Sequence, residues 1–280
     1  MTTDDKKALI LGISGCSSSG KTTLARLLRD IFPDTFILHQ DDFYRPETEL
    51  PYKNGLLDWD CAAAIDVPAM VDALAYIRQH AEFPPTLDSK EDQNSVGKCP
   101  VPEATVAALK AKVSSALLQL PPPSPSSSTL PSSSSHPPPP PAPPSPQQQQ
   151  QRPHPRLCLL DGFLLYGPSM AALRSSFDVK LFLRASYARA KARREARDGY
   201  VTLEGFWADP PGYVDAVVWP NYVEEHAWMF EGGDVEGRFR VDVLRDEDIR
   251  VIEGAPVDAD MERLLEWMVD VILEELRKLH

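Results

Sequence analysis

The eight residues 15–22, Gly-Cys-Ser-Ser-Ser-Gly-Lys-Thr, constrain the fold and chemistry of this 280-residue chain more than any other stretch. They match the phosphate-binding pattern G-x-x-x-x-G-K-[ST] at every position. Gly15 and Gly20 allow backbone conformations that a side chain would block, so the N–H groups between them can turn inward around an anion. Lys21 can follow the β- and γ-phosphates, and the Thr22 hydroxyl can ligate Mg²⁺. The pattern therefore predicts a site for ATP and Mg²⁺.

The segments on either side of this loop are the ones the pattern requires. Residues 8–14 form a short apolar run, which is typical of a strand buried on both faces. Residues 21–31 follow with apolar side chains at helical spacing, namely Leu24, Leu27, Leu28 and Ile31. The amino terminus of this helix would add about half a positive charge facing the phosphates. Because motif and context agree, a chance Gly/Ser turn is the weaker interpretation.

Composition excludes several other classes of protein. The formal net charge of −12 argues against a nucleic-acid-binding surface, and no apolar run approaches the ~20 residues of a membrane span. The four cysteines are scattered, which favours a reducing compartment over disulfides or a zinc site. Residues 1–7 are polar and lead straight into the first strand, so we expect no signal peptide. We expect a cytoplasmic protein, with the nucleus also open, and no nucleic-acid or membrane partner.

Acidic residues follow two of the predicted strands. Residues 35–39 predict a second strand that delivers Asp41 and Asp42 to the sheet edge where ligands bind. A base or metal ligand near the γ-phosphate suits this position, although a solvated turn would carry the same pattern. Residues 157–160 predict a strand that ends at Asp161, where a magnesium ligand or a water-orienting group belongs in a phosphate-loop protein.

Periodic segments elsewhere predict the remaining elements. Helices are expected at residues 66–80, 103–118, 186–198, 211–230 and 258–279, and strands at 178–183, 239–244 and 251–252. Asp66 should cap the first of these helices, and Pro220 should bend the fourth.

The composition changes abruptly at residues 120–155, which contain 15 of the chain's 28 prolines and a run of five glutamines. Few apolar residues are present to offset the cost of ordering the segment, so we predict disorder. Predicted strands flank it on both sides, which makes it an insertion within one domain, 1–280. Residues 137–144 could form a polyproline helix for an SH3- or WW-type partner, although an inert loop is the favoured interpretation.

The predicted helix 186–198 is basic in a chain that is acidic elsewhere. Its cationic residues are Arg189, Lys191, Arg193, Arg194 and Arg197. A solvated basic face and a nucleic-acid contact are two interpretations. We favour a third, a lid that closes over ATP and stabilises charge on the transferring phosphoryl group. Gly199 and the Pro-Pro-Gly at 210–212 would bound such a mobile element.

Taken in order, these segments resemble the nicotinamide riboside kinases, within the uridine kinase-like group of P-loop kinases. The matching residues are 12–15, 20–24, 40–44 (Gln-Asp-Asp-Phe-Tyr), 53–55, 59–60, 161–165, 191–197, 212–213 and 218–220 (Val-Trp-Pro). The resemblance implies an α/β P-loop NTPase fold, with a parallel sheet of about five strands sandwiched between helices, an Arg-rich lid and a long disordered insertion.

The same resemblance implies a reaction, in which ATP phosphorylates the 5′-hydroxyl of nicotinamide riboside, and roles for individual residues. Asp41 would be the catalytic base and Lys21 the catalytic cation. The nucleotide would be bound by Gly15, Cys16, Ser17, Ser18, Ser19, Gly20, Lys21, Thr22, Thr23, Arg193 and Arg197. The nucleoside would be bound by Asp41, Asp42, Phe43, Tyr44, Trp59, Asp60 and Arg194. Magnesium would be held by Thr22, Asp41 and Asp161.

Trp59 stands where the family often has tyrosine, and it bears on the choice of substrate. An aromatic face beside Asp60 suits a pyridinium cation, with a stacking energy of about 0.5–2 kcal/mol.

A uridine/cytidine kinase is the alternative enzyme, because Asp60 could equally bind ribose hydroxyls. A nucleotide-gated scaffold that uses the Pro-rich insertion is the alternative outside enzymes. A GTPase switch is weaker, because the sequence lacks an Asn-Lys-x-Asp motif. We also expect oxidation of Cys16, inside the loop, to block nucleotide binding.

Overall fold

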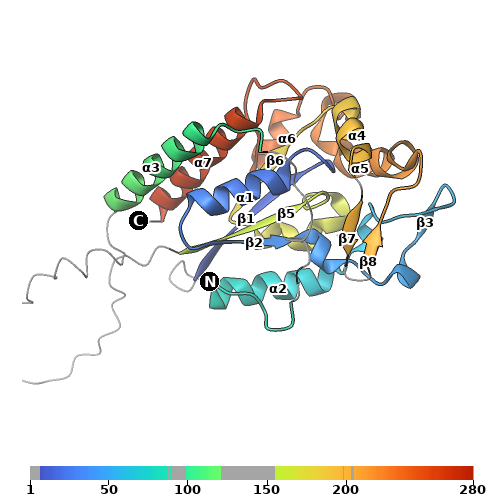
Figure 1. The fold of residues 1–280 in the computed structure, drawn as a ribbon, viewed down its shortest axis with the longest axis horizontal. Coiled ribbons are helices and arrows are strands. Elements are labelled where there is room, and N and C mark those ends of the chain that lie inside the picture. The colour runs from blue at the N-terminus through green and yellow to red at the C-terminus, as the bar shows by residue number, and fades with distance from the viewer. Residues whose placement is uncertain are drawn as a thin grey trace, which may run out of the picture.

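A five-stranded parallel sheet lies at the centre of the computed structural model, which describes residues 7–87, 89, 99–120, 155–197, 199–202 and 205–279 (Figure 1). The strands lie in the order β2 (Thr35–His39), β5 (Arg156–Gly162), β1 (Ala8–Gly15), β6 (Val179–Leu183) and β9 (Ile249–Arg250). Every pairing in this sheet is parallel. The predicted fold class is confirmed, including the number of strands.

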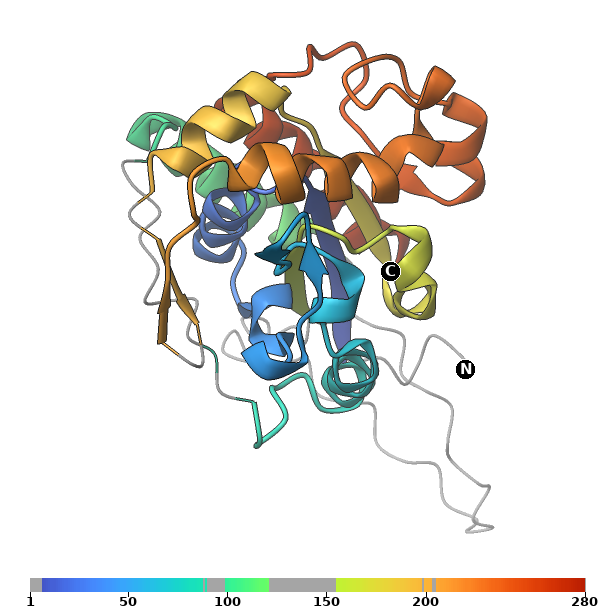
Figure 2. The same ribbon diagram turned by 90° about the vertical axis from the view of Figure 1, so that its right-hand side faces the viewer.

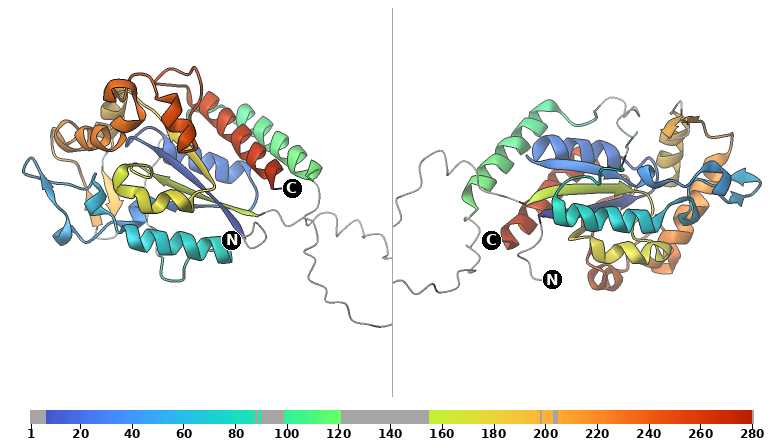
Figure 3. Two further views of the ribbon diagram at one scale, coloured as in Figure 1. Left: turned by 180° about the vertical axis from the view of Figure 1, so that it is seen from behind. Right: turned by 90° about the horizontal axis from the view of Figure 1, so that it is seen from below.

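Helices cover both faces of the sheet, as the apolar sequences of β1 and β5 require. On one face lie α1 (Lys21–Ile31), α3 (Glu103–Gln119) and α7 (Met261–Lys278), which also pack on one another. On the other face lie α2 (Val67–His80) and a 3₁₀ segment, Pro168–Ser176 (Figure 3). Each face buries its own apolar core, so the sheet separates two hydrophobic clusters.

Acidic side chains cap two of these helices: Asp66 as the sequence predicts, and Asp260, which begins the last helix two residues after the expected start at 258. Asp66 accepts a hydrogen bond from the Ala69 N–H at 3.1 Å and caps α2. Asp260 accepts one from the Glu262 N–H at 2.8 Å and caps α7. Each cap satisfies a backbone donor that has no partner within its helix.

The remaining elements gather near the carboxyl ends of the strands (Figure 2). They are the hairpins β3 (Tyr52–Lys53) with β4 (Leu56–Leu57) and β7 (Tyr200–Thr202) with β8 (Gly205–Trp207), and the helices α4 (Tyr187–Glu195) and α5 (Trp219–His226). A π-helical turn, Val214–Val218, leads into α5. Pro220 has no N–H to donate to the Ala216 carbonyl four residues earlier, and that carbonyl accepts a hydrogen bond from the Asn54 side chain at 2.8 Å.

Two sequence-based expectations are corrected. Residues 239–244 are not a strand, because a helix, α6 (Val241–Asp246), follows an isolated bridge at Phe239, and the last strand is β9. Apolar and polar side chains alternate over residues 239–243, which favours a strand, but so short an alternation does not determine the element. The basic helix α4 ends at Glu195 rather than at residue 198, so Arg197 lies beyond it.

Residues 121–154 lie outside the described part of the chain, and with them the predicted disorder and the segment 137–144. The described chain stops after α3 and resumes just before β5, and both of these points lie at the end of the molecule remote from α4 and α5 (Figure 1). Within the described residues, no helix has the length and apolarity to cross a membrane.

We predict that Gly12→Ala destabilises the protein by about 1–3 kcal/mol through overpacking. A Cβ at Gly12 would lie 2.6 Å from the Tyr166 hydroxyl, which is fully buried and donates to the Gly12 carbonyl at 2.7 Å. Tyr166→Phe removes that oxygen, so Gly12→Ala should cost less in the Tyr166→Phe background. Urea unfolding of the two single variants and the double variant measures the coupling, and additive costs would contradict the argument.

We predict that the buried His226 makes stability depend on pH. Burial lowers its pKa to about 4, and its Nδ1–H donates to the Tyr222 carbonyl at 2.8 Å. In the unfolded chain His226 binds a proton below about pH 6.5, whereas in the folded chain it stays neutral until about pH 4. The contribution of His226 to the free energy of unfolding is therefore complete above pH 6.5. Between these two values it falls by about 1.4 kcal/mol for each pH unit. Urea midpoints between pH 4.5 and 7.5 should fall less steeply for His226→Phe, and parallel profiles would refute this.

Candidate functional site

In the loop 15–20, between β1 and α1, the two glycines adopt the positive φ angles that the sequence pattern predicts. Gly15 and Gly20 have φ of 146° and 102°, which L side chains rarely adopt. A Cβ at Gly15 would lie 2.2 Å from the Leu183 carbonyl oxygen, so the loop packs against the end of β6. Glycine at this position is therefore required both by conformation and by space.

The amino terminus of α1 is open to an anion. No side chain caps it, and its first turn contains no acidic residue. The Lys21 ammonium lies beside it, buried, and donates to the Cys16 carbonyl at 2.9 Å. Burial lowers the pKa of Lys21, and the charges of Cys16, Asp161 and Asp41 oppose this shift. The loop thus offers backbone donors and one cation to a phosphate group.

Two of the predicted acids, Asp161 and Asp41, are close enough to Lys21 to raise its pKa electrostatically. Asp161 ends β5 and Asp41 follows β2 in a short 3₁₀ helix, Gln40–Phe43. Burial opposes ionisation of Asp161, but His39 and the Thr22 hydroxyl outweigh it and hold the pKa of Asp161 below its usual value. The His39 Nδ1 lies 2.6 Å from Asp161 Oδ1, a contact that the sequence did not predict.

These residues fit a magnesium ion. The structure's described residues contain no group of three or more His, Cys, Asp or Glu side chains suited to a metal. Mg²⁺ does not require such a group, because it takes few protein oxygens together with phosphates and water. Asp161 Oδ2 is buried without a hydrogen-bond partner within the described chain, and Thr22 lies beside this carboxylate. Hard oxygen donors next to Lys21 suit the ion that the loop sequence implies.

The neighbours of Asp41 in sequence face elsewhere. Asp42 accepts hydrogen bonds from the His39 N–H at 3.3 Å and from the Ser89 hydroxyl at 2.7 Å, so both its oxygens have local partners. Phe43 is buried in the core on the α2 side of the sheet. Neither residue joins the group of aromatic rings that contains Tyr44 and Trp59.

That aromatic group surrounds Trp59. The Tyr44 and Trp59 rings are 5.2 Å apart between centroids, and Trp207 of β8 lies 5.5 Å from Trp59. Phe163, after β5, stacks at 6.5 Å on Tyr44. The loop after β4, which carries Trp59, therefore meets the hairpin that carries Trp207 through their aromatic rings.

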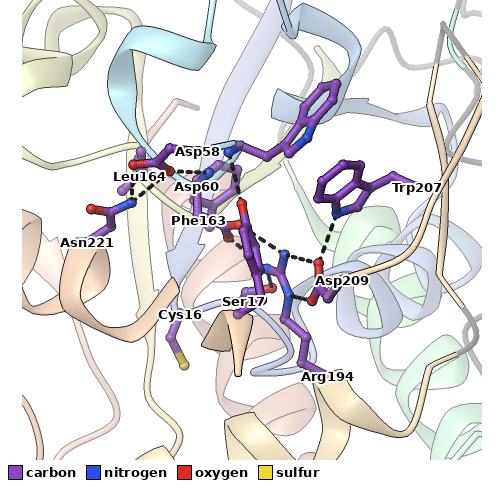
Figure 4. Close-up of polar contacts among 12 residues, drawn as sticks. Cys16, Ser17, Asp58, Asp60, Phe163, Leu164, Arg194, Trp207, Asp209 and Asn221 are labelled. Atoms are coloured by element: carbon purple, nitrogen blue, oxygen red, sulfur yellow. Dashed lines mark hydrogen bonds and ion pairs between the residues drawn. The ribbon is translucent and has the colours of Figure 1, made fainter. Parts of the chain in front are cut away.

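The Arg194 guanidinium connects three parts of the site (Figure 4). It donates to both oxygens of Asp60, at 2.7 and 2.9 Å, and to both oxygens of Asp209, at 2.6 and 3.2 Å. It also donates to the Ser17 hydroxyl at 2.9 Å, inside the phosphate loop. The lid helix, the acid after Trp59 and the nucleotide loop are thus joined by one buried side chain.

Further polar contacts, which the sequence did not predict, fix the loop around Trp59. The Tyr213 hydroxyl accepts the Trp59 N–H and donates to the Leu57 carbonyl, each at 3.0 Å. The Asn221 side-chain amide donates to both oxygens of Asp58 at 2.9 Å. Asp58 in turn accepts the Asp60 N–H at 3.0 Å. The sequence signals in this region are the helix expected at 211–230 and the family resemblance of residues 212–213 and 218–220.

The other two lid arginines lie on the nucleotide side. Arg193 donates to the carbonyls of Ser18 and Ser19 at 3.2 and 3.5 Å, which brings α4 against the phosphate loop. Arg197 lines a cavity of about 450 Å³ between the end of α4 and residues 208–214, with Arg194, Asp209 and Tyr213 also in its wall. A cavity of this size is in the range of small-molecule sites.

Cys16 does not have the reactivity expected from the sequence. Its side chain is buried behind the loop, and burial raises the pKa of the thiol to about 11 despite the charges of Lys21 and Arg193. Oxidants attack the thiolate, which is scarce here at neutral pH. The structure therefore argues against Cys16 as a redox control of nucleotide binding.

Comparison with known proteins gives a consistent picture, although no family model matches the chain. A Schizosaccharomyces pombe protein named nicotinamide riboside kinase is 34% identical over 97% of this chain and 99% of its own length. An Eremothecium gossypii protein of the same name is 32% identical over 94% of this chain and 92% of its own. The human protein named nicotinamide riboside kinase 2 is 27% identical over 81% of this chain and 71% of its own.

We predict that iodoacetamide at pH 8 alkylates the folded protein at the exposed Cys99 and leaves Cys16 and Cys158 unmodified. Burial raises the pKa of both protected thiols and shields them from the reagent. Peptide mass mapping before and after unfolding in urea measures the modification. Loss of nucleotide binding in step with alkylation of Cys16 in the folded protein would contradict this.

Proposed function

This chain belongs to the nicotinamide riboside kinase family, and we propose on that premise that it transfers the γ-phosphoryl group of ATP to the 5′-hydroxyl of nicotinamide riboside. The product would be nicotinamide mononucleotide, a precursor in NAD biosynthesis. The observation that carries the proposal is the convergence of the phosphate loop, Asp41 and the Asp60–Arg194 pair at one edge of the sheet.

On the nucleotide side, the loop amides and Lys21 bind the β- and γ-phosphates, and Arg193 closes over them from α4. Thr22, Asp41 and Asp161 would hold the magnesium ion, which when bound neutralises charge on the phosphate oxygens. Arg197 lines the cavity at the end of α4, and from there it would add positive charge as the phosphoryl group moves.

On the nucleoside side, Asp41 takes the proton of the attacking 5′-hydroxyl. Asp60 accepts hydrogen bonds from the ribose hydroxyls, and Arg194 holds that carboxylate in place through two of its nitrogens. Tyr44 and Trp59 supply aromatic rings near Asp60; Trp59 is 5% exposed and packs against Tyr44 and Trp207, so the base would have to part these rings to stack on Trp59. A pyridinium ring is attracted to an aromatic face by about 0.5–2 kcal/mol, and a neutral uracil would gain less.

The alternatives gain less support. A uridine/cytidine kinase would use the same phosphate loop and base but would gain less from the aromatic group, because its base is neutral. A nucleotide-gated scaffold has no need of a base beside the γ-phosphate.

The strands on both sides of residues 121–154 belong to one sheet, which supports a single kinase domain interrupted by an insertion. A partner for residues 137–144 stays a sequence-based prediction.

A nucleoside panel assayed with ATP and Mg²⁺ tests the proposed function directly. We expect nicotinamide riboside to be phosphorylated with a higher kcat/KM than uridine or cytidine, because only its base carries a positive charge. Mass spectrometry of the products identifies the nucleotide formed. The proposal fails if no nucleoside consumes ATP, and it gives way to the alternative enzyme if uridine is preferred.

We predict that Asp41→Ala lowers kcat by about 10²–10⁴-fold while ATP still binds, because the general base is lost and the phosphate loop is intact. Asp41→Asn keeps the size of the side chain and removes its basicity, so it should lose a similar factor. Steady-state kinetics and titration with a fluorescent ATP analogue separate the two effects. Near-normal turnover in Asp41→Asn would remove this residue from the role of base.

A further inference from the structure

Two buried polar side chains face each other at the carboxyl ends of neighbouring strands. His39 ends β2 and pairs in register with Asp161 of β5, and each residue is 4% exposed. The His39 Nδ1 lies 2.6 Å from Asp161 Oδ1. The parallel register of the two strands therefore sets the contact, which does not depend on a loop.

The direction of this hydrogen bond follows from the chemistry of the two groups. A carboxylate can only accept, so the proton lies on Nδ1 and His39 donates. The bond occupies Oδ1; Oδ2 is buried and makes no hydrogen bond of standard geometry with the described residues, and the Thr22 hydroxyl is the group near this carboxylate that lowers its pKa. A buried carboxylate oxygen without a partner is costly unless a group from outside the chain completes it.

The surroundings of the pair hold both side chains in place. The His39 N–H donates to Asp42 at 3.3 Å, which fixes the end of β2. The Gln40 side-chain oxygen accepts hydrogen bonds from the N–H groups of Phe163 and Leu164, at 2.9 and 3.1 Å, and so fixes the turn after Asp161. The pair is therefore constrained on the β2 side and on the β5 side.

We propose that His39 is a positioning residue, which holds the Asp161 carboxylate by one oxygen so that the other faces the phosphate loop and its magnesium ion. This rests on the proposed function, since it assigns Asp161 a role toward Mg²⁺–nucleotide. His39 itself touches neither substrate nor metal. It acts by fixing the orientation of a ligand, as hydrogen-bond partners of metal ligands do in other sites.

His226 shows what a purely structural buried histidine looks like in the same molecule. It is fully buried, and its Nδ1–H donates at 2.8 Å to a backbone carbonyl of its own helix rather than to a carboxylate. Removing either imidazole should cost stability. Only removal of His39 should change the response to magnesium, which makes His226→Leu a matched control.

The experiment compares His39→Leu, His39→Asn and His226→Leu. The Asn amide can donate from about the place of Nδ1, whereas Leu cannot. Binding of a fluorescent ATP analogue is titrated with Mg²⁺ in the absence of nucleoside, so the readout needs no turnover. For His39→Leu we expect the half-saturating Mg²⁺ concentration to rise about 10-fold and kcat to fall about 10–100-fold, with an unchanged KM for the nucleoside. His39→Asn and His226→Leu should stay within about threefold of the wild type on both measures.

Thermal unfolding of each variant separates positioning from stability. If His39→Leu does not fold, His39→Ser, whose hydroxyl is too short to reach Asp161, takes its place. An unchanged Mg²⁺ response in a folded His39→Leu or His39→Ser variant would overturn the proposal, as would an equal defect in His39→Asn. Failure of the proposed function looks different: the wild type would bind Mg²⁺–nucleotide but phosphorylate no nucleoside, and the Mg²⁺ shift would still report on His39.

Discussion

The parallel register of β1, β2 and β5 is the constraint on which the rest of the structure depends. It sets Ile13 and His39 on either side of Asp161, so the phosphate loop and both predicted acids begin at one edge of the sheet. Backbone hydrogen bonds along the three strands hold this arrangement, and two apolar cores cover it. Since loops supply the reacting groups, a rigid edge is what gives them fixed starting points. The glycines of the phosphate loop then permit the close approach to β6 that turns the chain into α1.

Arg194 holds the loops around the site in fixed positions relative to the phosphate loop. Its guanidinium pairs with two carboxylates and one hydroxyl, which come from the loop after β4, the segment after β8 and the phosphate loop. The planar fork of arginine allows several bidentate contacts at once, which a lysine could not provide. Buried charges of this kind are costly when a partner is missing, so the arrangement favours one closed geometry of the site.

Sequence patterns predicted the local features well and the long-range contacts poorly. The phosphate loop, α1 and the capped helix α2 depend on neighbouring residues, and their bounds agree with the structure to within a residue or two. The contacts of His39, Asp209 and Asn221 join residues 122, 15 and 163 positions apart, which no local period encodes. The reactivity of Cys16 was misjudged for the same reason, because burial by distant segments sets it. The strand expected at 239–244 was wrong because so short an alternation of apolar and polar residues does not determine an element.

The ends of α3 and β5 have a practical consequence. Both meet residues 121–154 at the pole of the molecule remote from the nucleotide loop. We therefore expect changes in the length of that stretch to leave the arrangement of the nucleotide-binding residues unaltered. The same pole is a suitable place to splice in a fluorescent reporter or an affinity handle without obstructing the entry of small molecules.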